Sequence, residues 1–235
     1  MMQFDIITIF PKIFDSYFAE GVLSRAIKEN IIKINVHDLR KYSNNKHNKV
    51  DDTPYGGGVG MIMKVEPVYR ALLDLKIIKK DGTRTVKSQT NTKVFLMSAK
   101  GRQYNQNSAR EFAELKKIIL ICGRYEGVDE RVAKYLTDGE ISVGEYILTG
   151  GEIPAMIVVD SVSRLISGVL GNEDSIINES FSQSGYIEHP YYTRPDVFSP
   201  VKNIKWEVPK VLQGGNHQNI EQWKQKYSRT VKGLQ

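Results

Sequence analysis

The chain has 235 residues, of which 40% are hydrophobic and 26% charged, and this balance excludes an intrinsically disordered protein. Its apolar runs fall far short of the roughly 20 residues that a membrane-spanning helix needs. The net charge of +6 favours a polyanionic partner. The single cysteine, Cys122, excludes an internal disulfide and suits the cytoplasm, and the scattered histidines predict no structural zinc.

The first two-thirds of the chain alternates short apolar runs with amphipathic stretches, which predicts an α/β domain with a mostly parallel sheet. The expected strands are, in chain order, residues 4–9, 31–38, 94–98, 118–122 and 141–148. The expected helices are residues 13–29, 65–75, 107–115, 130–135 and 154–167. Pro154 suits the first turn of the last helix, because proline there forgoes no helical hydrogen bond.

The last part of the chain differs in composition. Residues 168–185 are rich in Asn, Ser and acidic residues and predict an interdomain linker. In residues 186–235, eight Lys and Arg face four Asp and Glu, and aromatic residues are interleaved among them. Such a segment can grip phosphates and stack bases, so we favour a nucleic-acid partner. The alternative is a small domain whose rings form its core and whose lysines are solvated.

Two glycine-rich segments follow apolar runs, Cys122 to Gly127 and Ser142 to Pro154. Glycine at the end of a strand lets the backbone approach a ligand where a Cβ atom would collide. We therefore expect a pocket that reads its ligand mainly through backbone groups. The sequence contains no P-loop, and residues 56–60 lack the third glycine of a dinucleotide-binding loop, since Met63 stands in its place.

Six segments occur in a fixed order: Pro-Tyr-Gly-Gly-Gly-Val-Gly-Met at 54–61, the block at 122–131, the block at 142–154, Asp-Ser-Val-Ser-Arg at 160–164, His-Pro-Tyr-Tyr-Thr-Arg-Pro at 189–195 and Gly-Asn-His at 215–217. This series closely resembles the bacterial tRNA (guanine-37-N1)-methyltransferase family of the SPOUT superfamily. The resemblance runs from near the N-terminus to a further expected helix near the C-terminus, which Asn216 can cap and which carries Ile220, Trp223 and Tyr227 on one face.

The resemblance implies an α/β fold with a deep trefoil knot and a small helical C-terminal domain. It divides the chain into a knotted cofactor-binding domain at 1–167, a flexible linker at 168–185 and a tRNA-binding domain at 186–235. It also implies a homodimer with shared active sites. The implied reaction transfers a methyl group from S-adenosylmethionine to N1 of the guanosine 3′ of the anticodon, with Mg²⁺ required.

The resemblance also assigns residues to the cofactor and to RNA. The cofactor-binding residues would be Met97, Ser98, Gly101, Cys122, Gly123, Arg124, Tyr125, Glu126, Gly127, Ser142, Val143, Gly144, Tyr146, Ile147, Leu148, Gly150, Gly151 and Pro154. The RNA-binding residues would be Arg194, Lys202, Lys205, Lys210, Asn216 and His217. Cys122 follows an apolar strand, and by that position it is most simply a buried small hydrophobe and not a nucleophile.

Methylation of guanine N1 requires a base that takes the N1 proton and a cation that stabilises charge on O6. Arg164 matches the family's catalytic arginine, although by pattern alone it would be a surface arginine paired with an acid. The base would be Glu179, where the family usually has aspartate before Ser-Phe, with Asp174 as the alternative. Both could instead be solvated linker carboxylates.

Several roles stay open at this stage. Glu126 and Glu145 would contact the cofactor, a magnesium ion or the target base, or would pair with Arg124 or Arg131. Two rival functions are a related methyltransferase with another RNA target and a catalytically silent RNA-binding protein. The blocks at 54–61 and 189–195 argue against another RNA target, because they are particular to the tRNA guanine-N1 group. The intact glycine loops and Arg164 argue against a silent protein.

Overall fold

The chain consists of two units, Met1–Gly171 and Asn172–Gln235. The computed structural model describes residues 1–85 and 91–231, apart from the side chains of residues 173 and 174. The first unit ends within the segment predicted as an interdomain linker.

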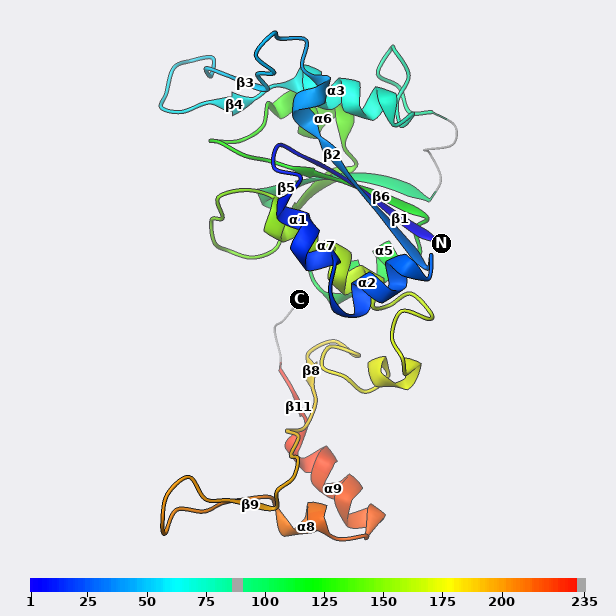
Figure 1. Cartoon of the computed structure of the whole chain (residues 1–235), viewed down its shortest axis with the longest axis vertical. Coiled ribbons are helices and arrows are strands. Elements are labelled where there is room, and N and C mark those ends of the chain that lie inside the picture. Colours follow the sequence, from blue (N-terminus) through cyan, green and yellow to red (C-terminus); the bar gives the residue numbers. More distant parts are fainter. Residues whose placement is uncertain (86–90, 232–235) are drawn as a thin grey trace. The chain divides into compact units, whose positions relative to one another are not determined.

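The first unit is built on a five-stranded sheet with the strand order β2-β1-β6-β5-β7 (Figure 1). The strands are β1 (Met2–Thr8), β2 (Ile32–Asp38), β5 (Thr92–Gln103), β6 (Lys117–Cys122) and β7 (Gly139–Ser142). Every neighbouring pair in this sheet runs parallel, which confirms the predicted α/β class. The central strand β6 is almost wholly apolar because both of its faces are covered.

Helices cover both faces of the sheet, as Figure 1 shows. One face carries α1 (Ile13–Phe18), α2 (Gly21–Lys28), α5 (Gln106–Ala113) and α7 (Glu152–Ser163). The other face carries α3 (Val65–Asp74) and α6 (Glu130–Leu136), next to a short 3-10 helix, η1 (Leu39–Tyr42). The alternation of side chains along β1 supplies both cores, because Phe4 and Ile6 join the first and Ile7 joins the second.

Three predicted elements are wrong in their extent. The expected helix at 13–29 is two helices, because Gly21, the first residue of α2, has a φ of +63° that a continuous helix does not allow. The expected strand at 141–148 ends at Ser142, and the residues that follow form a loop in which Ile147 is 84% exposed. The last helix of the sheet domain also begins and ends earlier than predicted, since α7 starts two residues before Pro154.

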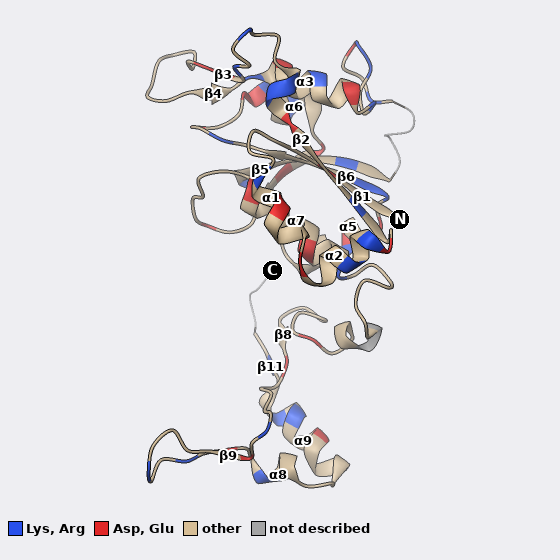
Figure 2. Ribbon diagram, viewed as in Figure 1, with Lys and Arg blue, Asp and Glu red and all other residues tan. Residues whose placement is uncertain are grey.

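The described residues of the second unit form short elements, of which α9 (His217–Tyr227) is the longest at 11 residues. The other helices of this unit are the 3-10 helix η2 (Glu173–Ile176) and α8 (Lys210–Gln213). Strand β8 (Tyr186–Ile187) pairs with β11 (Arg229–Thr230), and β9 (Val197–Phe198) pairs with β10 (Trp206–Glu207). The side chain of Asn216 accepts a hydrogen bond from the amide of Asn219 at 3.2 Å, which confirms the predicted cap of α9. Lysine and arginine residues lie on α8, on α9 and on the loop beyond β9 (Figure 2).

Candidate active site

A cavity of about 350 Å³ lies at the carboxyl ends of β5, β6 and β7. This is the edge at which parallel α/β sheets bind their ligands. Three loops line the cavity, at 96–100, 123–128 and 140–151, together with Pro154. All of the residues predicted to bind the cofactor line it except Gly101 and Cys122.

Gly101 does not line the cavity but lets the first loop pack against the backbone of β7. Both Met97 and Arg102 of β5 pair with Ile141 of β7, so the four residues between them bulge out of the ladder. A Cβ atom on Gly101 would lie 2.4 Å from the backbone nitrogen of Ile141. Only glycine therefore fits the bulge that turns Ser98 and Lys100 toward the cavity.

Cys122 lies beneath the cavity and is fully buried. Burial and then the negative charge of Glu152 raise the pKa of its thiol well above the usual value. Cys122 is therefore a small apolar side chain of the core, as the sequence suggested, and Gly151 packs directly on its backbone.

The sequence analysis did not predict the hydrogen-bond network around Glu152. The Glu152 carboxylate is only 1% exposed, and it accepts hydrogen bonds from the hydroxyl of Thr8 at 2.7 Å and from Nε of Arg124 at 2.8 Å. Arg124 thus pairs with Glu152, and Arg131 pairs with Asp129, so neither arginine has the partner that we considered. The available signal was a glutamate at the start of a helix, followed by an apolar run that extends to Val159.

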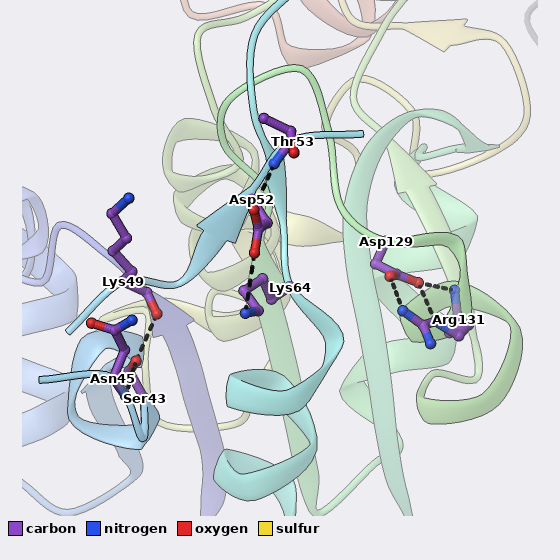
Figure 3. A network of polar contacts seen from close by, with 8 residues as sticks. All are labelled: Ser43, Asn45, Lys49, Asp52, Thr53, Lys64, Asp129 and Arg131. Atoms are coloured by element: carbon purple, nitrogen blue, oxygen red, sulfur yellow. Dashed lines mark hydrogen bonds and ion pairs between the residues drawn. The ribbon is translucent and has the colours of Figure 1, made fainter. Parts of the chain in front are cut away.

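The glycine-rich segment at 54–61 belongs to an arm beside the cavity, between β3 (Asp51–Asp52) and β4 (Ile62–Met63). The amide of Glu126 donates to the carbonyl of Met61 at 3.1 Å, and the amide of Met63 donates to the carbonyl of Gly127 at 2.9 Å. At the base of this arm Asp52 contacts Thr53 and Lys64, and nearby Asp129 holds Arg131 (Figure 3). The arm and the cofactor loop are therefore one connected structure.

Arg164 lies elsewhere in the first unit. It follows the last turn of α7 and lines a second cavity, of about 620 Å³, together with Tyr17 and Asp160. The hydroxyl of Tyr17 donates to Asp160, and this hydrogen bond, aided by burial, raises the pKa of Tyr17 to about 12. Within one chain, Arg164 and the glycine loops thus line different cavities.

Glu179 lies in the second unit, on a loop held to β8. The carbonyl of Glu179 accepts from the amide of Ser182 at 3.0 Å, and the amide of Phe181 donates to the carbonyl of Tyr186 at 2.7 Å. Next to it, the hydroxyl of Ser180 donates to Glu188 at 3.3 Å. Asp174 lies in η2, and its side chain lies outside the described residues.

The predicted RNA-binding residues are exposed in the second unit. Lys202 and Lys205 lie on the loop between β9 and β10, Lys210 begins α8, and His217 begins α9 after the capping residue Asn216. Arg194 precedes β9. This unit also has a cavity of about 760 Å³, which the sequence analysis did not predict. Several aromatic rings line it, among them His189, Tyr191, Tyr192 and Trp223.

Among the described residues, His, Cys, Asp and Glu side chains form no group of three that could hold a metal ion. The same part of the chain contains no helix that is both long enough and apolar enough to cross a membrane.

A parallel sheet whose glycine loops enclose a pocket at its carboxyl edge defines the class of cofactor-binding α/β proteins. Comparison with known proteins gives the family: the model of tRNA (Guanine-1)-methyltransferase TrmD matches residues 2–233. The chain belongs to this family.

Curated relatives agree with the family match over nearly the whole chain. A tRNA (guanine-N(1)-)-methyltransferase of Dehalococcoides mccartyi is 46% identical over 233 residues, which cover 98% of this chain and 88% of that protein. Proteins of the same name from Clostridioides difficile and Listeria monocytogenes are 44% and 45% identical over 97% of this chain, covering 92% and 87% of their own lengths.

Proposed function

We propose that this protein methylates N1 of guanosine-37 in tRNA, the nucleotide 3′ of the anticodon, with S-adenosylmethionine as the methyl donor. The family match over residues 2–233 carries this proposal. Because the substrate is tRNA, we place the enzyme in the cytoplasm.

The glycine-lined cavity suits the cofactor in size. Its volume of about 350 Å³ lies in the range of small-molecule sites. Gly123, Gly150 and Gly151 line the cavity with backbone, because a Cβ atom on any of them would crowd neighbouring protein atoms. Once bound, S-adenosylmethionine supplies an electrophilic methyl group; the chain's part is to orient it and to shield it from water.

Two side chains would serve the target base. We assign to Glu179 the removal of the N1 proton and to Arg164 the stabilisation of negative charge on O6. Glutamate reaches about 1.5 Å further than the aspartate usual in this family, by the length of one carbon–carbon bond. Asp174 is the alternative base. We also propose that the reaction requires Mg²⁺.

The active site would be shared between two subunits of a homodimer. Two observations support this: Arg164 and the glycine loops line different cavities within one chain, and α1 and α7 pack together with exposed apolar side chains. These side chains are Ile13, Tyr17, Ile153 and Ile157. An exposed apolar face of this kind is typical of a subunit interface.

The knot, the domain division and the RNA contacts belong to the same proposal. The knot rests on the family match, and the loop after β7 lies beside the loop after β6, where Gly151 contacts Cys122 and Gly123. The domains would be residues 1–167 and 186–235, joined by the linker at 168–185. Arg194, Lys202, Lys205, Lys210, Asn216 and His217 would contact tRNA, and their exposure supports this.

The test is transfer of a labelled methyl group from S-adenosylmethionine to two tRNA transcripts in the presence of magnesium. One transcript carries guanosine 3′ of the anticodon and the other carries adenosine there. We expect incorporation into the first only, with 1-methylguanosine as the product. A folded dimer that binds the cofactor but labels neither transcript would instead favour a different RNA target or a silent RNA-binding protein.

A further inference from the structure

Glu152, a buried carboxylate outside the predicted set of site residues, is hydrogen-bonded to a residue that lines the cofactor cavity. Glu152 is the first residue of α7, where the positive end of the helix dipole favours a negative charge. It accepts from Thr8 at 2.7 Å and from Nε of Arg124 at 2.8 Å. Arg124 lines the cavity, whereas Glu152 does not.

The guanidinium of Arg124 also contacts the loop at 143–150. Its Nη1 donates to the carbonyl of Thr149 at 3.0 Å, and its Cζ lies 4.8 Å from the centre of the Phe10 ring. Gly150 passes so close that a Cβ atom there would lie 2.1 Å from Nε of Arg124. Arg124 therefore fills the space beneath the loop that carries Tyr146, Ile147 and Leu148 into the cavity wall.

We propose that Glu152 is a positioning residue for the cofactor: it holds Arg124, and Arg124 holds the loop at 143–150 over the cavity. Thr8, at the end of β1, completes the network, because its hydroxyl holds the other carboxylate oxygen of Glu152. This inference rests on the proposed function, because it assigns a role within the same cofactor site.

The physical reason lies in the flexibility of the loop itself. The residues at 144–149 are exposed or partly exposed, and Gly144 has a φ of +159° that few other residues adopt. Such a segment has few apolar contacts to order it. A charged hydrogen-bond pair in a buried place is geometrically demanding, so it selects one position of the loop among many.

The experiment must separate positioning from stability, and the chain offers a matched control. Asp5 lies on the same strand as Thr8, is also 1% exposed, and pairs with Lys117 at 2.7 Å, but it does not line the cofactor cavity. Glu152→Gln and Asp5→Asn thus remove equivalent charges from buried ion pairs. Thr8→Val replaces the hydroxyl with a methyl group and serves if Glu152→Gln does not fold.

The dissociation constant for S-adenosylmethionine would be measured by titration calorimetry, well below the unfolding temperature of each variant. We expect it to rise about 10- to 100-fold in Glu152→Gln and about 3- to 10-fold in Thr8→Val, while Asp5→Asn stays within roughly twofold of the unaltered protein. The KM for S-adenosylmethionine should rise in step, with the KM for tRNA unchanged. Hydrogen exchange of residues 144–151 should quicken in Glu152→Gln and not in Asp5→Asn.

The inference would be overturned if Glu152→Gln and Thr8→Val both kept the cofactor affinity of the unaltered protein and lost only stability, as Asp5→Asn does. The network would then have a purely structural role. Failure of the unaltered protein to bind S-adenosylmethionine would remove the proposed function and this inference together. The two failures are therefore distinct.

Discussion

The amide of Gly151 donates a hydrogen bond to the carbonyl of Gly123 across 2.9 Å, and this bond joins the loop after β7 to the loop after β6. The two backbones touch so closely that a Cβ atom on Gly151 would lie 2.7 Å from Cα of Cys122. Because the obstacle is backbone and not the end of a flexible side chain, the loops cannot keep this arrangement around any larger residue.

Gly151→Ala should therefore disturb the cofactor cavity. We expect a loss of stability of about 1–3 kcal/mol from overpacking and a weakening of S-adenosylmethionine binding of at least about tenfold. Thermal unfolding and titration calorimetry would measure the two effects. Gly171→Ala is the matched control, since a Cβ atom there meets nothing within 4 Å. Cofactor binding that matched the control would contradict the close approach.

Acid should weaken the first unit through Asp5. Burial alone would raise the pKa of this carboxyl group, but hydrogen bonds from His37 and Lys117 outweigh burial and lower the pKa to about 2, from the usual 3.8. The folded state therefore binds this proton less readily than the unfolded chain. The stabilisation is complete above about pH 4 and is lost as the pH falls toward 2, by about 2 kcal/mol.

Urea unfolding at several pH values would test this effect, with Asp5→Asn as the comparison. The difference in unfolding free energy between the two proteins should be largest near pH 6 and shrink below pH 4. A difference that stayed constant down to pH 2 would mean that Asp5 titrates normally in the folded protein.

The thiol of Cys122 should be unreactive in the folded protein, because it is buried and its pKa is raised. We expect a thiol reagent to modify it only as fast as the protein opens, and immediately in denaturant. The absorbance of the chromophore that the reagent releases measures the rate of modification with and without denaturant. Fast modification without denaturant would indicate that the loops above Cys122 are open in solution.

Glu179→Gln should lower kcat about 10²- to 10⁴-fold, the usual range for the loss of a general base, with little change in cofactor affinity. Asp174→Asn is the matched change in the same segment and should retain activity. If the two results are exchanged, Asp174 is the base.

A shared active site predicts complementation between two inactive variants. At a limiting concentration of S-adenosylmethionine, Arg164→Ala and Gly151→Ala would each have low activity as homodimers, provided that both still dimerise. In mixed dimers, one of the two sites would combine an intact arginine from one subunit with intact glycine loops from the other. We expect methyl transfer to return on mixing. No recovery, in mixed dimers verified by mass spectrometry, would place both groups in the same subunit's site.

Much of the fold could be predicted because it depends on local pattern. The apolar runs at 118–122 and 31–38 are strands of the expected parallel sheet, and Asn216 caps α9 as its side chain chemistry suggests. The run at 146–148 misled because it is apolar yet lies in an exposed loop. Apolar character alone does not distinguish a buried strand from a cavity wall or a subunit interface.

By itself, the sequence determined the family, through six segments in order, and the parallel α/β class, through the alternation of apolar and amphipathic stretches. Only the tertiary structure decided which charged groups meet. Glu152 lies 28 residues from Arg124 and 144 residues from Thr8, and Arg164 lines a different cavity from the glycine loops. Periodicity reports which face of an element is buried, whereas the partner of a buried charge depends on how distant segments pack.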